Sequence, residues 1–170
     1  MSIKISYSNK STRNISGNIV LFVDEKFNIS DIKKFISNQD FSYIKDLIKS
    51  NDLKKKLLVF EVSSKKKIIL ISIKKEINNS DIENLGAEFF GKINYGVKSE
   101  YAIISDSISG KHDNLLGHFL HGLKLKSYKF KKYKSKKEKR IISLNVLGIK
   151  NKPSIKDQLK FKALEEGTFY

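Results

Sequence analysis

The chain has 170 residues, a mass of 19.5 kDa and a formal net charge of +16, which fits one domain that needs no disulfide bond to fold. It contains no cysteine, which excludes a disulfide framework, a cysteine nucleophile and an iron–sulfur site. Because 39% of the residues are hydrophobic, yet no apolar run approaches the roughly 18 residues of a membrane span, we expect a folded, soluble, cytoplasmic domain with no membrane partner.

The first half of the chain predicts two strands, a helix and a hairpin. Residues 2–7 alternate between polar and apolar as in a strand, and the apolar run 18–23 indicates a second one. Residues 57–62 and 68–73 flank a polar turn and predict a hairpin. These two runs are the most apolar of the chain, so we expect both in the middle of a sheet. Asp40 is expected to cap an amphipathic helix that carries Phe41, Ile44, Leu47 and Ile48 on one face.

The second half continues the alternation of helices and strands. Ser80 and Glu83 form a capping-box pattern that predicts a helix start. Residues 100–105 indicate a strand, and residues 113 to about 124 indicate a helix with an apolar face. The inward side chains of the first of these helices are expected to be Ile82, Leu85, Phe89 and Ile93.

The last elements complete the prediction of the fold. Residues 141–147 indicate a strand, and the capping pattern at 154–157 predicts a final helix that carries Ile155, Leu159 and Leu164. Strands alternating with helices predict a three-layer α/β sandwich with a mixed sheet of about six strands. Its inward residues are expected to include Leu21, Val59, Phe60, Ile69, Ile71, Ile103, Leu120 and Ile142.

The sequence contains few candidates for catalytic or metal chemistry. His112, His118 and His121 fall in or beside one helix, where we interpret them as polar residues flanking an apolar face, because no third ligand has a suitable spacing. Gly110 and Lys111 resemble the end of a phosphate loop but lack its first glycine and its Ser or Thr.

Two further patterns have structural interpretations. The glycines of the segment 86–91 are interpreted as sites of close helix packing rather than of dinucleotide binding. Glu165 and Glu166 would point about 100° apart on a helix, so we interpret them as a solvated face and not as an acid–base pair. We therefore assign no catalytic residue.

A basic segment, residues 124–140, holds ten Lys or Arg residues among seventeen. Its aromatic residues could stack on bases while its lysines contact phosphate; alternatively they pack back on the domain. We favour packing, with Phe130 largely buried. The candidate polyanion contacts are Lys129, Lys131, Lys132, Lys134, Lys136 and Lys137.

The same segment resembles a known family. A helix, a glycine and then Tyr128, Phe130, Tyr133 and Lys134 are similar to a stretch late in the N-terminal domain of the leucyl (cytosol) aminopeptidases. The segments 19–25, 85–91 and 163–170 also follow the family order, and 154–170 resembles the start of its interdomain helix. The resemblance covers essentially the whole chain and makes Tyr128, Phe130 and Tyr133 structural positions of the family motif.

The resemblance implies a macrodomain-like, non-catalytic N-terminal domain over residues 1–170. The parent would be a hexameric, two-metal (zinc or manganese) metallopeptidase, a hydrolase that removes N-terminal amino acids from peptides. The expected partners are its own catalytic domain and further copies. The family motif Asn-Thr-Asp-Ala-Glu-Gly-Arg-Leu, which carries metal ligands, is absent here, so this chain alone is expected to be inert and to bind no metal.

Two alternatives belong to other functional classes. The basic segment could make the chain a nucleic-acid-binding domain. A macrodomain-like fold could also bind a nucleotide or ADP-ribose at the strand ends, although only Gly110 lies where a phosphate loop would need several glycines.

Overall fold

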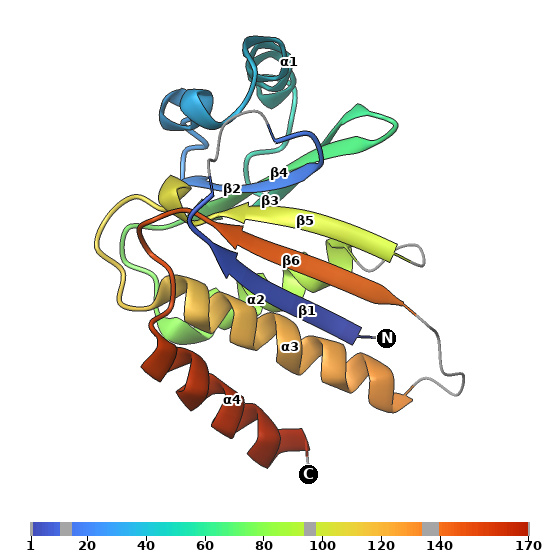
Figure 1. The fold of residues 1–170 in the computed structure, drawn as a ribbon. Helices are drawn as coiled ribbons and strands as arrows, with labels where there is room; N and C mark the ends of the chain where they lie inside the picture. Colours follow the sequence, from blue (N-terminus) through green and yellow to red (C-terminus); the bar gives the residue numbers. More distant parts are fainter. Residues whose placement is uncertain (1, 11–14, 94–97, 134–139, 170) are drawn as a thin grey trace.

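The structure is a computed structural model that describes residues 2–10, 15–93, 98–133 and 140–169. Strands and helices alternate along the chain and form one central sheet with helices on both sides (Figure 1). The predicted α/β class with a six-stranded mixed sheet is therefore confirmed.

The sheet has the strand order β1-β6-β5-β2-β4-β3, and only β3 runs antiparallel to its neighbour. The two strands β2 and β4 have almost continuous runs of buried residues, because helices cover both of their faces. The strand bounds are β1 (Ser2–Ser8), β2 (Asn18–Asp24), β3 (Leu57–Ser63), β4 (Lys66–Ile73), β5 (Lys98–Ile104) and β6 (Ile141–Leu147).

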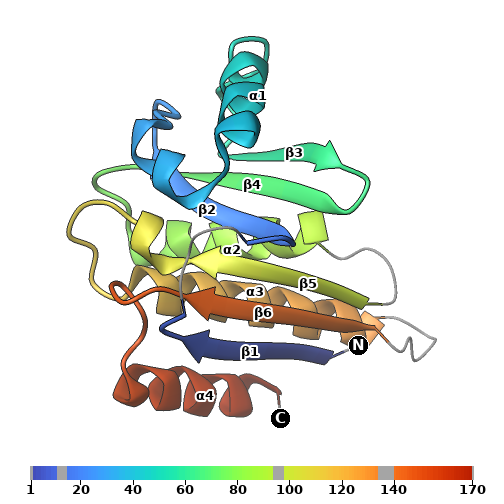
Figure 2. The same ribbon diagram turned by 45° about the horizontal axis from the view of Figure 1, so that its top comes forward.

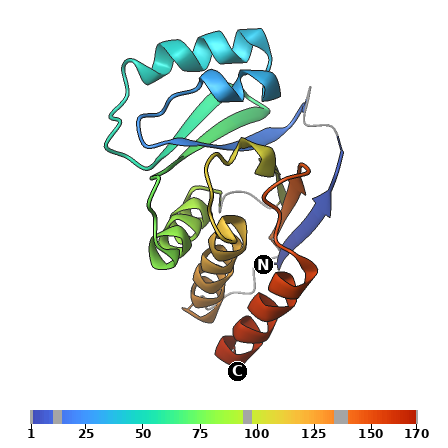
Figure 3. The ribbon, with the colours of Figure 1, turned by 90° about the vertical axis from the view of Figure 1, so that its left-hand side faces the viewer.

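Helices cover the two faces of the sheet unequally (Figure 3). The helices α2 (Asn79–Ile93) and α3 (Leu115–Tyr133) pack on one face, from β4 across to β6. The short helix η1 (Ser30–Phe35) and α1 (Asn38–Ile48) cover the other face over β2, β3 and β4. The core cluster on this second face includes no buried residue of β1 or β6 among the described residues, so half of the face lacks a helical layer.

The last helix, α4 (Ile155–Phe169), lies next to α3 and beyond the edge of the sheet that β1 forms (Figure 2). A short turn, η2 (Ser105–Ser107), follows β5. None of the described helices is both long and apolar enough to span a bilayer.

The helices α2 and α3 approach each other closely at two glycines. A methyl group on Gly86 would overlap the carbonyl oxygen of Phe119, and one on Gly122 would overlap the carbonyl oxygen of Glu83. Close packing, predicted for the segment 86–91, is therefore confirmed at Gly86. At Gly91 it is wrong, because nothing lies within 4 Å of the place its methyl group would take.

The predicted position of the hairpin in the sheet is half right. β4 is an inner strand, but β3 is the edge strand, with β4 as its neighbour. Val59 on β3 was expected to be buried and is 37% exposed, because α1 covers the other face of this strand. The other predicted inward residues are buried: Leu21, Phe60, Ile69, Ile71, Ile103, Leu120 and Ile142.

Two predicted helix starts are wrong by two or three residues. The hydroxyl of Ser37, and not the carboxylate of Asp40, caps α1 by accepting the N–H of Asp40 at 3.1 Å. The side-chain oxygen of Asn78, and not Ser80, accepts the N–H of Asp81 at 2.8 Å at the start of α2. In both places several polar side chains compete for the cap.

Other boundaries also differ in part. The predicted cap at Ser154 is confirmed, since its hydroxyl accepts the N–H of Asp157 at 3.1 Å. The helix expected to end near residue 124 instead continues as α3 to Tyr133.

Candidate functional site

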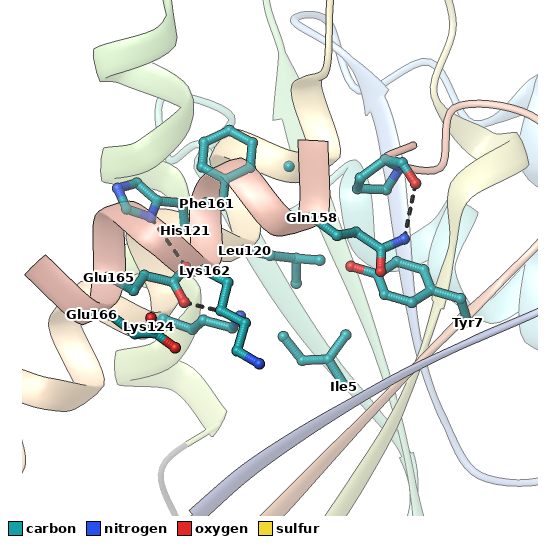
Figure 4. A pocket seen from close by; sticks show the side chains of 12 residues that line it. Ile5, Tyr7, Leu120, His121, Lys124, Gln158, Phe161, Lys162, Glu165 and Glu166 are labelled. Carbon is teal, nitrogen blue, oxygen red and sulfur yellow. Dashed lines mark hydrogen bonds and ion pairs between the residues drawn. The ribbon is translucent and has the colours of Figure 1, made fainter. Parts of the chain in front are cut away.

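A groove opens between the edge strand β1 and the helices α3 and α4 (Figure 4). Its volume is about 400 Å³, within the range of roughly 300–1,000 Å³ found for ligand pockets. We call it the α4 groove. The side chains that define it are Ile5 and Tyr7 from β1, Leu120, His121 and Lys124 from α3, and Gln158, Phe161, Lys162, Glu165 and Glu166 from α4.

The carboxylate of Glu165 is the central charged group of the groove. Glu165 is buried, and its two oxygens lie 3.1 Å from Nδ1 of His121 and 3.1 Å from Nζ of Lys124. A buried carboxylate is strongly destabilising unless it is paired. Here both pairing groups come from α3, so these contacts hold α4 against α3.

The prediction that Glu165 and Glu166 form a solvated face is wrong for the first of the two. They do diverge, as helix geometry requires, but Glu165 turns inward and Glu166 stays exposed. The signal that could identify Glu165 in the sequence is its spacing of four residues from Phe161, which is also buried.

The apolar side chains of α4 are placed differently from the prediction. Ile155, Leu159 and Leu164, expected on the inner side, are 77%, 61% and 51% exposed, while Phe161 is buried. The pairing of Glu165 and the packing of Phe161 fix the rotation of the helix, which turns the aliphatic residues outward.

The histidines pair with different partners. Nδ1 of His118 lies 2.9 Å from the carboxylate of Glu83 on α2, whereas His121 pairs with Glu165 on α4. The ring of Phe161 lies against both, with ring centroids 5.0 Å from His118 and 5.1 Å from His121. His118 and His121 thus join helices and do not converge on one point where a shared metal could bind.

Tyr7 gives the groove a neutral polar group. Burial, together with the negative charge of Glu165, raises the pKa of Tyr7 to about 12, so its hydroxyl stays protonated at neutral pH. The side-chain amide of Gln158 donates to the carbonyl oxygen of Pro153 at 3.0 Å. The groove therefore offers hydrocarbon, a phenol and a compensated carboxylate, which suit binding better than proton transfer.

The basic segment is partly helical and solvent-exposed. Lys129 and Lys132 are exposed on α3, and Tyr128 is half-buried. Tyr133 is 83% exposed, so the expectation that it packs on the domain is wrong: it lies at the last residue of the helix, past the groove. The side chains of Phe130 and Lys131, and the residues Lys134, Lys136 and Lys137, lie outside the described residues.

A second cavity, of about 600 Å³, lies at the carboxyl ends of β2 and β4. In α/β sheets ligands commonly bind at such strand ends. The carboxylate of Asp24, however, already accepts the N–H groups of Lys26 and Asn28 at 3.0 and 2.9 Å. Gly110, with φ +85°, is the glycine that lines this cavity. It is separated from the start of α3, at Leu115, by four residues. This loop does not form a phosphate cradle at a helix start.

The two divalent metals that the family resemblance implies do not fit on the described residues of this chain. Among these residues no three His, Asp or Glu side chains come together in a group that could hold a metal ion. The acidic partners of His118 and His121 are already engaged in helix contacts.

Comparisons with known proteins relate the chain to solved structures but not to a family model or a curated sequence. No family model matches it, and no curated protein matches its sequence. A solved structure of a mutant of tomato leucine aminopeptidase matches with a TM-score of 0.67 at 17% sequence identity. The match covers 98% of this chain and 36% of that chain, so this chain spans about a third of the aminopeptidase. The fold expected from the family resemblance is thereby confirmed.

Proposed function

We propose that this chain is the non-catalytic N-terminal domain of an enzyme of the leucyl aminopeptidase type, where it supports assembly. One observation carries the proposal: nearly the whole chain, 98%, matches an aminopeptidase structure of which it accounts for 36%. A chain that matches about a third of a longer chain over nearly its own full length corresponds to one part of that longer chain. The motifs at residues 128–134 and 163–170 support the N-terminal position.

The activity belongs, in this proposal, to the catalytic domain of the parent. That domain would hold two divalent metals, zinc or manganese, and would remove N-terminal amino acids from peptides in the cytoplasm. Two-metal hydrolysis requires carboxylates clustered around both ions. On this chain the part-buried pair His118–Glu83 and the buried pair His121–Glu165 instead join α3 to α2 and α4.

The gene provides the direct test. Its reading frame beyond codon 170 is expected to continue into Arg-Asp and then a metal-binding domain with the Asn-Thr-Asp-Ala-Glu-Gly-Arg-Leu motif. A frame that stops there, or that continues into an unrelated domain, contradicts the proposal.

The purified chain gives the enzymatic test. We expect no leucine release from leucine anilide when manganese or zinc is supplied, because the described residues offer no metal-ligand group. A complete leucine aminopeptidase assayed in parallel is the positive control. Leucine release that co-purifies with this chain would show that the domain is itself catalytic.

A second candidate function, nucleic-acid binding, is favoured by the exposed end of α3. Tyr133 is largely exposed, and Lys129 and Lys132 are exposed on the same helix, an arrangement in which an aromatic ring can stack on a base. If it does, Tyr133→Ala weakens the binding of single-stranded DNA by about tenfold, while Tyr43→Ala, at a half-exposed tyrosine on α1, does not. If the two variants bind single-stranded DNA with equal affinity, Tyr133 does not stack on a base, and the binding is non-specific charge attraction.

A further inference from the structure

The strand β1 forms one edge of the sheet. It has few of the features that normally keep an exposed edge strand from pairing with another chain. Its seven residues pair with β6 in one unbroken register, from Ser2 opposite Ile141 to Ser8 opposite Leu147. It carries one charged side chain, Lys4, and no proline. The opposite edge strand, β3, has a register shift between Glu61 and Ser63. Bulges and charges of this kind normally prevent an edge from pairing with another strand.

The outward backbone groups of β1 are those of its odd-numbered residues. The N–H of Ser2 donates to the carbonyl of Arg140 at 2.7 Å, and the carbonyl of Ser8 accepts the N–H of Gly148 at 3.2 Å. In a parallel ladder alternate residues bond to the same neighbour. The N–H and C=O groups of Ile3, Ile5 and Tyr7 therefore point away from β6, toward the open edge.

The α4 groove lies directly beside this edge. Ile5 and Tyr7 line it from β1, and Phe161 and Lys162 line it from α4. Figure 2 shows α4 beyond β1, and Figure 1 shows it displaced from the sheet toward the layer of α3. A strand added to β1 would place every second side chain in the groove, because side chains alternate between the two faces of a sheet.

The charges around the edge favour an acidic occupant. Lys162 lines the groove and is exposed, as are Lys4 on β1 and Lys10 just after it; of the carboxylates among the described residues that line the groove, only that of Glu166 is exposed. The exposed aliphatic side chain of Leu159 lies three residues before Lys162, on the flank of α4 that continues the groove. A second copy of the chain would bring a net charge of +16 and its own α4 into the same space, so it is the less suitable partner.

We propose that β1 and the α4 groove form a receptor for an extended segment of another polypeptide, which adds to the sheet as a seventh strand. The segment has apolar residues at alternate positions, which enter the groove, and a net negative charge that matches the lysines. Main-chain hydrogen bonds to Ile3, Ile5 and Tyr7 hold it, and the groove selects its side chains. This mode of recognition, β-strand addition, combines sheet pairing with pockets for alternate residues.

The test uses a synthetic peptide, fluorescein-(Glu-Val)₃-Glu-amide, and the same labelled peptide with N-methyl groups on alternate residues. Fluorescence anisotropy is expected to show saturable binding of the first at concentrations below about 1 mM and at least about tenfold weaker binding of the second. In the complex the amide protons of Ile3, Ile5 and Tyr7 should exchange at least about tenfold more slowly, while those of the inward-bonded Lys4 and Ser6 stay unchanged.

Variants separate the edge from general charge attraction. Ile5→Pro removes an outward N–H without touching the ladder to β6, and should weaken binding at least about tenfold. Lys162→Glu, beside the groove, should weaken it more than Lys160→Glu on the other side of α4. If Ile5→Pro does not fold, the exchange pattern of the unaltered chain decides the question.

Several results would overturn the proposal. The first is that the peptide shows no saturable binding up to about 1 mM. The second is that the N-methylated peptide binds as tightly as the first peptide. The third is that the amide exchange rates of Ile3, Ile5 and Tyr7 do not change in the complex. Sedimentation that shows a dimer lost in Ile5→Pro would overturn it in favour of a second copy as the occupant.

Discussion

Glu165 is the residue on which the position of α4 depends most. Its buried carboxylate pairs with His121 and Lys124, so Glu165→Gln leaves Lys124 without its counter-charge and replaces the carboxylate that faces His121. We expect a loss of about 2–3 kcal/mol in the free energy of unfolding, at the low end of the cost of breaking buried pairs because Lys124 reaches solvent. Urea denaturation measures the loss.

The neighbouring carboxylate is the matched control. Glu166 is exposed, so Glu166→Gln should change the free energy of unfolding by less than about 0.5 kcal/mol. Equal effects of the two substitutions would show that the ion pairs of Glu165 do not hold α4.

Tyr7 makes the stability of the fold depend on alkaline pH. Its pKa is raised to about 12 in the folded chain from about 10 in the unfolded one, so the folded state holds the proton more tightly. The contribution of this proton to the free energy of unfolding is complete below pH 10 and is lost as the pH rises through 12. Because Tyr7 is only half-buried, we expect a loss of about 1–2 kcal/mol rather than the full value of the shift.

The comparison of the wild type with Tyr7→Phe isolates the effect of Tyr7 from that of the other titratable groups. The free energy of unfolding of the wild type should fall more steeply between pH 10 and 12 than that of the variant. Parallel curves would contradict the assigned role of Tyr7.

For single residues, the sequence predicts which side chains are buried better than it predicts which polar side chains pair with each other. Apolar residues in runs, such as Ile69 and Ile71, are buried as expected. The pairing of His121 with Glu165 joins residues 44 positions apart and depends on the rotation of two helices, which no local pattern contains. The candidate site was missed for this reason, since its residues come together only through tertiary packing.

Among the elements, the contact of α2 with α3 gives the sharpest prediction. Gly86→Ala would place a methyl group on the carbonyl of Phe119, and we expect a loss of about 3 kcal/mol because two buried backbones must move apart. Gly91→Ala, on the same helix with open space around it, should stabilise the chain by about 0.5 kcal/mol through helix propensity. Thermal unfolding distinguishes these outcomes, and a loss at both positions would contradict the packing assigned to Gly86.

The periodicity of apolar residues predicts which helices and strands exist. It does not predict where all of them end or in what order the strands lie in the sheet. Short apolar runs indicated β2 and β4 correctly, because strands buried on both faces need them. The length of α3 was underestimated because lysines give no apolar face, although they are good helix formers. That β3 lies at the edge depends on the order of strands, which hydropathy does not determine.

The whole molecule will bind polyanions weakly whatever its role. With a net charge of +16 it should bind duplex DNA at low salt without sequence preference, and this binding should be lost by about 0.2 M salt as counterions are no longer released favourably. Titration of two unrelated duplexes at rising salt measures this. Affinity that survives that salt concentration for one duplex only would indicate a specific site instead.

The pairing of β1 with β6 brings the first seven described residues next to residues 141–147, so the sheet is complete only after residue 147 has been made. During synthesis β1 is made before the other five strands of this sheet and has no partner until about 140 further residues have followed, a long interval at translation speeds of roughly 5–20 residues per second. A nascent chain stalled before residue 141 would expose the unpaired strand β1 together with the unpaired backbone edge of β5. Such chains are expected to bind holding chaperones, which release them once β6 emerges, and ribosome profiling of chaperone-bound nascent chains would show that release point.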